Sequence, residues 1–402
     1  MPENLPIPTC DWRYEQVPST VMPSSSQPNP IVVRAPGRVN LLGEHTDYTG
    51  GLVLPMAIPF YTTARISANG EAQNIFHSVQ FEGEYAEPVG NSAGRRKMWS
   101  DYPVGVLRQL QQRRIVPPAF VLELDGNVPL GAGLSSSASV EVASCLAMLA
   151  LSREMLPMNE LALLCQRAEN DYVGSPCGIM DQFVITTARA GHALLLATRD
   201  LKFEYVPMNT GGLSKVSVVI CNSHVKHSIA AGTYGDRRKQ VEAGQAVLRE
   251  HFTGLRDLGE ATLPQLQACE QAMTPESFKR CRHIITENAR VRQAREAMLG
   301  GNAQALGTLM VEAHASQRDD FECSCAGIDF LVDTAVALRG CFGARLTGGG
   351  FGGCTVNLVE HESVDGFCET LKDAYRERFG VSAETYVCQA VDGALAERER
   401  EA

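Results

Sequence analysis

The sequence lacks the features that mark several large classes of protein. No apolar run reaches the roughly 20 residues needed to span a bilayer, and the longest candidate, residues 138–151, contains Glu141. The net charge is −10, so no general basic surface is available to attract nucleic acid or an anionic membrane. The first 30 residues contain seven prolines and no apolar core. We therefore expect a poorly structured arm there, not a signal peptide.

The 13 cysteines follow no disulfide or zinc pattern. Their number is odd, and the closest pair, Cys323 and Cys325, has C-x-C spacing where metal and redox motifs have C-x-x-C. Cys145, Cys165 and others lie within apolar patterns, where a free thiol behaves as a small hydrophobic side chain. Reduced cysteines without a leader predict a cytoplasmic protein.

The length and the periodicity of the chain predict two α+β domains. A chain of 402 residues exceeds what one hydrophobic core usually supports. Helical and strand patterns alternate in both halves, and the character of the sequence changes near Gly211. We expect domains at residues 31–210 and 211–402. Expected strands cover residues 31–34, 120–124, 216–221, 354–359 and 384–388, and expected helices cover 137–151, 158–172, 237–250, 284–299, 302–318, 329–338 and 364–379.

The first chemically informative stretch is residues 38–48, in which four polar side chains, Glu44 to Asp47, lie between apolar segments. Carboxylates beside apolar chain are costly to bury without partners. The two carboxylates and the imidazole between them are acceptor-rich groups suited to adjacent sugar hydroxyls. A surface loop without function and a metal site are the alternatives, although the spacing matches no common metal motif.

The second stretch, residues 129–138, reads P-L-G-A-G-L-S-S-S-A and lies between an expected strand and an expected helix. Glycines allow the backbone to approach a phosphate, and the free N–H groups of a helix N-terminus attract anions. The G-K-[ST] ending of a Walker A loop is missing, as is the third glycine of the dinucleotide fingerprint. A glycine loop before a helix without phosphate binding is the alternative.

Two single carboxylates follow the serine loop. Glu169 shares a helical row with Ala162 and Cys165, so it points inward and suits Mg²⁺ bound together with nucleotide phosphates; an ordinary helix-edge glutamate is the alternative. Asp181 is the lone carboxylate of a largely apolar run, as expected for a proton acceptor or a buried helix cap. A third stretch, residues 346–354, has five glycines in six positions between an expected helix and an expected strand. Its alternative is a flexible turn.

Together these stretches resemble the galactokinases, a family of GHMP small-molecule kinases. The signature G-R-V-N-L-[LI]-G-E-H-T-D-Y is present at residues 37–48, the phosphate motif at 129–138, the catalytic-aspartate segment at 176–183 and the third motif at 346–354. The resemblance runs in order from residue 31 to the C-terminus. It implies an N-terminal domain with the phosphate loop, a ferredoxin-like C-terminal domain and an active site between them. Thr49 and Leu42, which flank the expected sugar contacts, depart from common family residues.

The resemblance implies phosphorylation of the anomeric O1 of galactose by ATP, with Mg²⁺. By matching motifs, Asp181 would be the base and Arg38 would stabilise the transferring phosphoryl group. The expected sugar-binding residues are Glu44, His45, Thr46, Asp47, Gly178 and Tyr234. The expected ATP-binding residues are Gly131, Ala132, Gly133, Leu134, Ser135, Ser136 and Ser137, with Ser78 added on a short local match. Ser137 and Glu169 would be the Mg²⁺ ligands.

These roles agree with the physics of phosphoryl transfer, which relies on positioning and charge neutralisation. Arg38 would supply the cation that the missing P-loop lysine does not. Two rival functions stay open: a regulator that binds galactose and ATP without catalysis, and a GHMP kinase of another acceptor, such as mevalonate or homoserine. We expect a monomer with no obligate protein, nucleic-acid or membrane partner.

Overall fold

The computed structural model describes residues 30–398 except 92 and 226–229, and for 230–234 and 396–398 it describes the backbone only. The arm expected at residues 1–30 therefore lies almost wholly outside the described residues. The strands are β1 (Ile31–Asn40), β2 (Leu52–Val53), β3 (Pro55–Ala68), β4 (Gln73–Ser78), β5 (Tyr85–Pro88), β6 (Phe120–Gly126), β7 (His192–Ala197), β8 (Lys202–Pro207), β9 (Val216–Asn222), β10 (Cys341–Thr347), β11 (Cys354–Glu360), β12 (Glu384–Cys388) and β13 (Leu395–Arg398). The α-helices are α1 (Asp101–Gln112), α2 (Ser136–Ser152), α3 (Met158–Arg167), α4 (Met180–Thr187), α5 (Ala230–His251), α6 (Leu263–Ala268), α7 (Pro275–Leu299), α8 (Ala303–Ser316), α9 (Ala326–Ala337) and α10 (Val364–Phe379).

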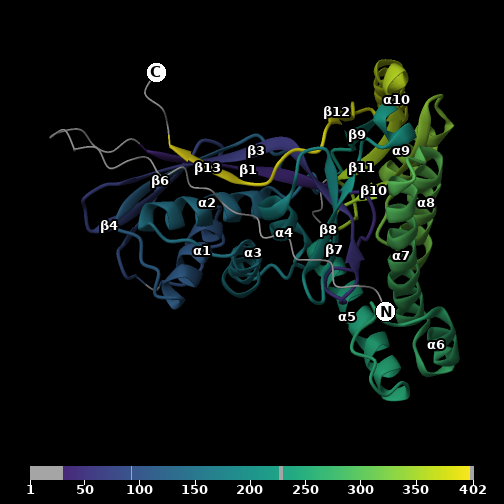
Figure 1. Ribbon diagram of the computed structural model, residues 1–402, viewed down its shortest axis with the longest axis horizontal. Helices are drawn as coiled ribbons and strands as arrows, with labels where there is room; N and C mark the ends of the chain where they lie inside the picture. Colours follow the sequence, from purple (N-terminus) through teal and green to yellow (C-terminus); the bar gives the residue numbers. More distant parts are fainter. Residues whose placement is uncertain (1–29, 92, 226–229, 399–402) are drawn as a thin grey trace.

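The first lobe is a six-stranded sheet covered by helices α1 to α4 (Figure 1). Its strand order is β13-β1-β3-β6-β4-β5. Alternate residues of the strands, such as Val33 and Ala35 on β1, are fully buried in one cluster with Val142 and Met148 of α2. Because side chains alternate across a strand, this pattern turns one face of the sheet toward α2. Helix α2 itself is apolar nearly all round, as expected of a buried helix.

The second lobe contains the four-stranded antiparallel sheet β10-β11-β9-β12 with helices on both faces. Strand β9 shows why: Val218 and Ile220 belong to a cluster with residues of α7 and α8, whereas Val219 and Cys221 belong to one with α9 and α10. A strand buried on both faces reads as a continuous apolar run, which is how β9 was recognisable from the sequence. The expected mixture of helices and strands in two lobes is confirmed.

The two lobes are joined by a buried cluster to which both contribute and by a strand that returns to the first sheet after the second lobe. One buried cluster combines Leu41, Leu42 and Met56 of the first lobe with Ile220 and Met310 of the second. The last strand, β13, returns to pair antiparallel with β1 (Figure 1). The expected boundary near residue 210 stays a prediction, but the chain crosses between the lobes more than once.

Two expected features differ from the structure. The glycine-rich stretch 346–354 connects the antiparallel strands β10 and β11, so its expected position between a helix and a strand is wrong. The expected helices 158–172 and 302–318 end early and continue as π-helical turns, Ala168–Val173 and Gln317–Phe321. Such turns widen the helix locally and are frequent at functional sites.

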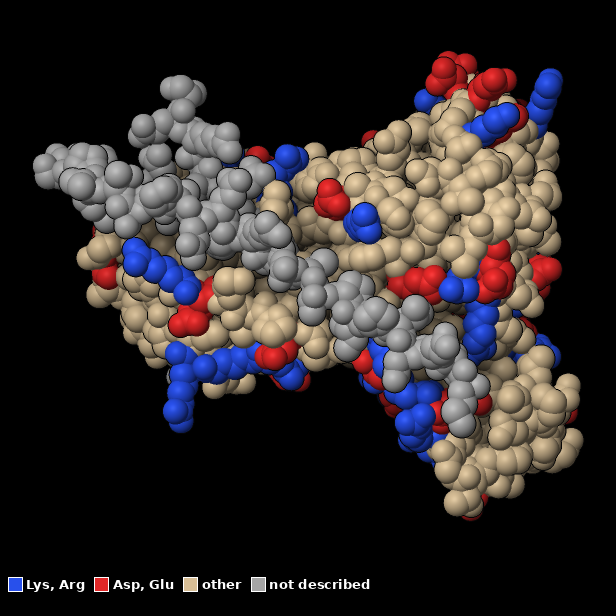
Figure 2. All heavy atoms as spheres, in the orientation of Figure 1, with Lys and Arg blue, Asp and Glu red and all other residues tan. Residues whose placement is uncertain are grey.

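The surface agrees with the composition. On the face drawn in Figure 2, Lys and Arg side chains of the described residues are interspersed with Asp and Glu and form no continuous basic field. Among the described residues no helix has the length and apolar character that crossing a membrane requires. The 12 cysteines in the described part of the chain are free thiols.

Candidate active site

An arginine–aspartate pair forms the centre of the site. Arg38 on β1 donates from Nε to Oδ1 of Asp181 at 2.7 Å and from Nη2 to Oδ2 at 2.6 Å. Its Nη1 donates to the carbonyl oxygen of Gly133 at 2.6 Å. Asp181 lies in the first turn of α4, where the helix dipole favours an anion. This two-bond geometry fixes the carboxylate plane, and the third bond fixes the arginine against the glycine–serine loop.

Ser135 connects that loop to Asp181. Its hydroxyl donates to Asp181 Oδ2. Ser135 precedes α2 in a left-handed conformation, φ 64° and ψ 47°, and its side chain caps no helix N–H group. A left-handed backbone costs a non-glycine residue roughly 1–2 kcal/mol, and strain of this kind concentrates at functional sites. The strained backbone turns the hydroxyl away from the helix and toward the aspartate.

The part of this loop that precedes Ser135 contacts Arg38 through backbone carbonyl groups, not through side chains. Gly131 and Gly133 have positive φ of 68° and 76°, and Ala132 and Leu134 are buried in the core shared by the lobes. The carbonyl oxygen of Leu134 accepts a hydrogen bond from the Arg38 backbone N–H at 3.1 Å. The structure places this loop before a helix, as expected from the sequence, and the side chains of Ala132 and Leu134 serve packing. Contact of the loop with ATP stays a prediction.

A pocket of about 310 Å³ opens next to the start of α2. That volume is within the range of small-molecule sites. Ser78, Ser136 and Ser137, all expected from the sequence, lie in its wall together with aromatic side chains that the sequence did not reveal. The pocket wall includes Ser78, Phe81, Trp99, Tyr102, Ser136, Ser137 and Val140. Aromatic and apolar side chains next to serine hydroxyls suit a ligand that has a planar aromatic ring joined to a polar group.

Glu169 is buried in the first of the two π-helical turns. Its carboxylate accepts a hydrogen bond from Gln182 Nε2 at 2.8 Å, and the Ser137 hydroxyl lies nearby. Burial and the nearby Asp181 raise the pKa of Glu169 to about 7. Gln182 Nε2 also lies 3.0 Å from the carboxylate of buried Glu141, and burial and Glu169 hold the pKa of Glu141 well above its usual value.

The donor set at Glu169 fits a magnesium ion. A carboxylate and a serine hydroxyl are hard oxygen donors, and Mg²⁺ is commonly bound by one or two protein groups plus nucleotide phosphates. Across the described residues no three His, Cys, Asp or Glu side chains are grouped around one point as an all-protein metal cage requires.

Asp47 lies beside the Arg38–Asp181 pair. Burial and the neighbouring Asp181 raise the pKa of Asp47 to about 7, against a hydrogen bond from the Met180 N–H that lowers it. Gly178 packs so closely that a Cβ at its position would lie 1.8 Å from Asp47 Oδ2. Asp47 and Gly178 are both expected sugar contacts, and in the structure the two residues are neighbours.

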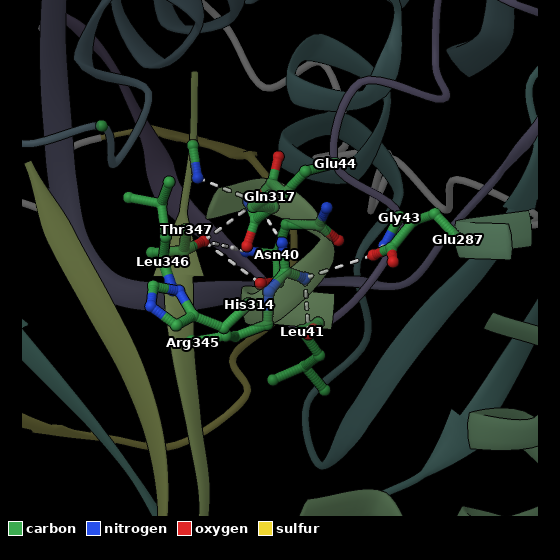
Figure 3. A network of polar contacts seen from close by, with 12 residues as sticks. Asn40, Leu41, Gly43, Glu44, Glu287, His314, Gln317, Arg345, Leu346 and Thr347 are labelled. Atoms are coloured by element: carbon green, nitrogen blue, oxygen red, sulfur yellow. Dashed lines mark hydrogen bonds and ion pairs between the residues drawn. The ribbon is translucent and has the colours of Figure 1, made fainter. Parts of the chain in front are cut away.

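Glu44 is 3% exposed and is held by the second lobe. The Gly348 N–H donates to Glu44 Oε1 at 2.8 Å, and Arg345 Nη2 lies 3.5 Å from the same oxygen. Burial raises the pKa of Glu44, while Arg345 and Arg38 lower it. The third glycine-rich stretch therefore contacts the expected sugar loop, and Figure 3 shows this network.

His45 and Thr46 face the protein interior. The imidazole of His45 stacks on Phe321, with ring centroids 4.0 Å apart, and burial and His283 lower its pKa well below the usual value. The hydroxyl of Thr46 lies within hydrogen-bond distance of the carbonyl oxygens of Gly43 and Leu52, so it braces the loop. Sugar contacts by these two residues stay predictions. The side chain of Tyr234 lies outside the described residues.

Part of the set of expected site residues thus lies together. Hydrogen bonds link Arg38, Asp181 and Ser135, and Asp47 accepts one from the Met180 N–H, next to Asp181 in the chain. The Ser137 hydroxyl lies near Glu169. Sequence reasoning missed Trp99 and Tyr102 in the pocket and Arg345 behind Glu44. Trp99 lies in a turn, Tyr102 at the start of α1 and Arg345 in a strand. None of them has a local sequence pattern that marks it as part of this site.

Three family models match the chain. "Galactokinase galactose-binding signature" matches residues 24–68, "GHMP kinases N terminal domain" matches 101–189 and "GHMP kinases C terminal" matches 294–377. A galactokinase from Roseiflexus sp. (strain RS-1) is 41% identical over 365 residues, which cover 90% of this chain and 92% of that protein. Galactokinase from Homo sapiens is 39% identical over 374 residues, with 90% of this chain and 91% of that protein covered.

The comparison with solved structures also finds a galactokinase. The crystal structure of Lactococcus lactis galactokinase complexed with galactose superimposes with a TM-score of 0.87 at 32% identity and covers 91% of this chain and 95% of that one. Mevalonate kinase from Methanococcus jannaschii has a TM-score of 0.67 at 19% identity, covering 92% and 100% of the two chains, a likeness of fold alone.

Proposed function

The chain belongs to the galactokinase family of GHMP kinases, and from that premise we propose that it transfers the γ-phosphoryl group of ATP to O1 of α-D-galactose. The observation that carries the proposal is the direct linkage of Asp181 to Arg38 and Ser135 at the start of α2. A proton acceptor, a cation and a phosphate-binding loop adjoin there. Phosphoryl transfer needs this combination, because its catalysis is mainly positioning and charge neutralisation.

Asp181 would take the O1 proton as O1 attacks the γ-phosphorus and ADP leaves. Oδ2 receives hydrogen bonds from both Arg38 and Ser135, whereas Oδ1 receives one, from Arg38, among the described residues. A carboxylate has about four acceptor positions, so we assign the proton transfer to Oδ1. A hemiacetal hydroxyl is more acidic than an ordinary alcohol, which makes a carboxylate base sufficient.

The remaining expected residues have consistent places in this proposal. Asp47, Glu44 and Gly178 would bind the sugar, and the free N–H groups at the start of α2 would bind the phosphates. The pocket lined by Trp99 would take the adenine. Mg²⁺, held by Glu169 and Ser137, would supply a Lewis acid that neutralises phosphate charge. These assignments and the expected monomer are part of the proposal.

A coupled assay of ADP release tests the proposal. We expect turnover with galactose, ATP and Mg²⁺, and none with mevalonate or homoserine in place of galactose. Saturable galactose binding without ADP release would indicate the sugar-sensing regulator instead. Turnover with a non-sugar acceptor in preference to galactose would refute the substrate assignment. Product identity is checked by ³¹P NMR, because a phosphate on an anomeric oxygen differs in coupling from one on O6.

A further inference from the structure

Arg345 is a buried cation that the proposed chemistry does not use. It lies on β10 with 0% exposure. An unpaired charge at such a depth costs several kcal/mol, so its partners define its role. Nη1 donates to the carbonyl oxygen of Leu41 at 2.8 Å, Nη2 lies 3.5 Å from Glu44 Oε1, and Nη1 lies 3.8 Å from Glu287 Oε1. One guanidinium thus contacts the loop after β1 at two points.

The second lobe holds this loop from several sides (Figure 3). The Gly43 N–H donates to Glu287 Oε1 at 2.8 Å, and His283 Nε2 lies 3.2 Å from the carbonyl oxygen of Glu44. Glu287 is in turn bound by Arg290 at 2.7 Å. The backbone of residues 41–44 is therefore fixed by groups on α7 and β10, and Arg345 is the cation that joins the two carboxylates.

The contacts of Glu44 are one-sided. Within the described residues, the donors that face its carboxylate are Gly348 N–H at 2.8 Å, Thr347 Oγ1 at 3.3 Å and Arg345 Nη2 at 3.5 Å, and all three face Oε1. Oε2 receives none of these contacts. The protein thus anchors one oxygen of the carboxylate and leaves the other oxygen for a ligand.

We propose that Arg345 is a positioning residue that anchors Glu44 through Oε1 and thereby aims Oε2 at one hydroxyl of the sugar. This inference rests on the proposed function, because it requires galactose as the ligand. The planar guanidinium suits the task, since it reaches Leu41, Glu44 and Glu287 at once, which a lysine ammonium cannot do in the same geometry. Arg345 also opposes the rise in the pKa of Glu44 that burial causes, so it favours the ionised acceptor.

Single-deoxy sugars test this role. For the parent enzyme and each variant, kcat/KM is measured with galactose and with its 2-, 3-, 4- and 6-deoxy analogues. Glu44→Gln identifies the hydroxyl that Glu44 binds, because discrimination against the matching deoxy sugar falls in that variant. We expect Arg345→Gln to lose discrimination at the same position by roughly 10- to 100-fold, the range for a hydrogen bond to a charged group, and to leave the other positions within about twofold.

Discrimination is the ratio of the kcat/KM values for two sugars, and the fraction of active enzyme cancels in this ratio. Partial misfolding of a variant therefore does not imitate the effect. Arg345→Lys keeps the charge without the fork, and we expect its discrimination to fall between those of the parent and Arg345→Gln. The matched control is Arg108→Lys, since Arg108 is a largely covered arginine, with its side chain 10% exposed, that pairs with buried Glu87 away from the sugar loop. Its ratios stay at the parent values.

The outcomes separate the two proposals. If the parent does not phosphorylate galactose, the proposed function fails and this inference fails with it. If the parent does, but Arg345→Gln lowers kcat/KM equally for every sugar, Arg345 only stabilises the fold and the inference alone is overturned. Loss of discrimination at a position different from that of Glu44→Gln also overturns it.

Discussion

Arg38 donates two parallel hydrogen bonds to Asp181, from Nε to Oδ1 at 2.7 Å and from Nη2 to Oδ2 at 2.6 Å. The pair joins the first strand of the chain to a helix 143 residues further on. Its side chains are 6% and 23% exposed, so the arginine is buried and the carboxylate edge can still be reached. A proton acceptor held this way has a fixed orientation before any substrate binds, which is how positioning lowers a barrier.

Replacing Asp181 by asparagine should stop the chemistry and spare the nucleotide site. General-base catalysis contributes roughly 10²- to 10⁴-fold, so we expect kcat of Asp181→Asn to fall by a factor in that range. ATP affinity, measured by calorimetry, should stay within about twofold, because the pocket lined by Trp99 does not include Asp181. Turnover near the parent rate would show that Asp181 is not the base.

Ser135 allows the hydroxyl and the strained backbone to be separated. Ser135→Ala removes the bond to Asp181 and keeps a Cβ at φ 64°; Ser135→Gly removes the same bond and relieves a strain of roughly 1 kcal/mol. We expect both variants to lose a similar part of kcat, and Ser135→Gly to have the higher melting temperature. If Ser135→Gly kept full activity while Ser135→Ala lost it, backbone conformation and not the hydroxyl would matter.

The elements that the sequence predicted best are those whose signals are local. Helix α10 and strand β12 match the expected residues 364–379 and 384–388, because an amphipathic run there ends at Gly380 in a left-handed cap. Strand β3 was missed: it contains Pro55 and Pro59, and proline normally argues against a strand. Its register with β1 shifts at Pro36 and Gly37, an irregularity that accommodates such residues.

The same distinction applies to the site. Arg38, Asp181 and the serine loop belong to contiguous motifs, so the sequence identified them. The contact of Arg345 with Leu41 spans 304 positions and depends on the pairing of β10 with β11 beside the sugar loop. An arginine in an apolar strand shows locally only that it needs a partner. Which partner it finds is decided by tertiary packing.

Trp99 should matter for ATP and not for galactose. Stacking of a base on an aromatic side chain is worth roughly 1–3 kcal/mol, so Trp99→Ala should raise the KM for ATP about 5- to 100-fold. The KM for galactose should stay at the parent value. The control is Met98→Ala, because Met98 is the exposed neighbour of Trp99 and does not line the pocket. An unchanged KM for ATP in Trp99→Ala would argue against adenine in this pocket.

Asp47 predicts a pH dependence of sugar binding. Its pKa is raised to about 7, chiefly by burial and by Asp181, and the ionised carboxylate is the better acceptor for sugar hydroxyls. The KM for galactose should therefore fall as the pH rises through 7. Asp47→Asn should remove this dependence, whereas the KM for ATP should show no change between the two proteins.

The raised pKa of Asp47 should also make the folded protein less stable as the pH rises, although sugar binding improves. A carboxyl whose pKa is raised on folding contributes stability that is fully present below its unfolded pKa of about 3.8 and is lost progressively as the pH rises from there to its folded pKa of about 7. The melting temperature of the parent should therefore decline between about pH 4 and pH 7 more than that of Asp47→Asn. Equal declines would show that Asp47 titrates near its ordinary value.

Gly178 is predicted to tolerate no side chain. A Cβ at this position would lie 1.8 Å from Asp47 Oδ2, so Gly178→Ala must displace the carboxylate or the chain before α4. Because the displaced group is an expected sugar ligand, the KM for galactose should rise roughly 10- to 100-fold, as for the loss of a charged hydrogen bond, while the KM for ATP stays within about twofold.

Gly366→Ala is the matched control, since a Cβ there meets nothing within 4 Å and Gly366 lies on α10. That change should leave both KM values unaltered and add up to about 1 kcal/mol of stability. A Gly178→Ala enzyme with the parent KM for galactose would mean that Asp47 does not bind the sugar from its present position.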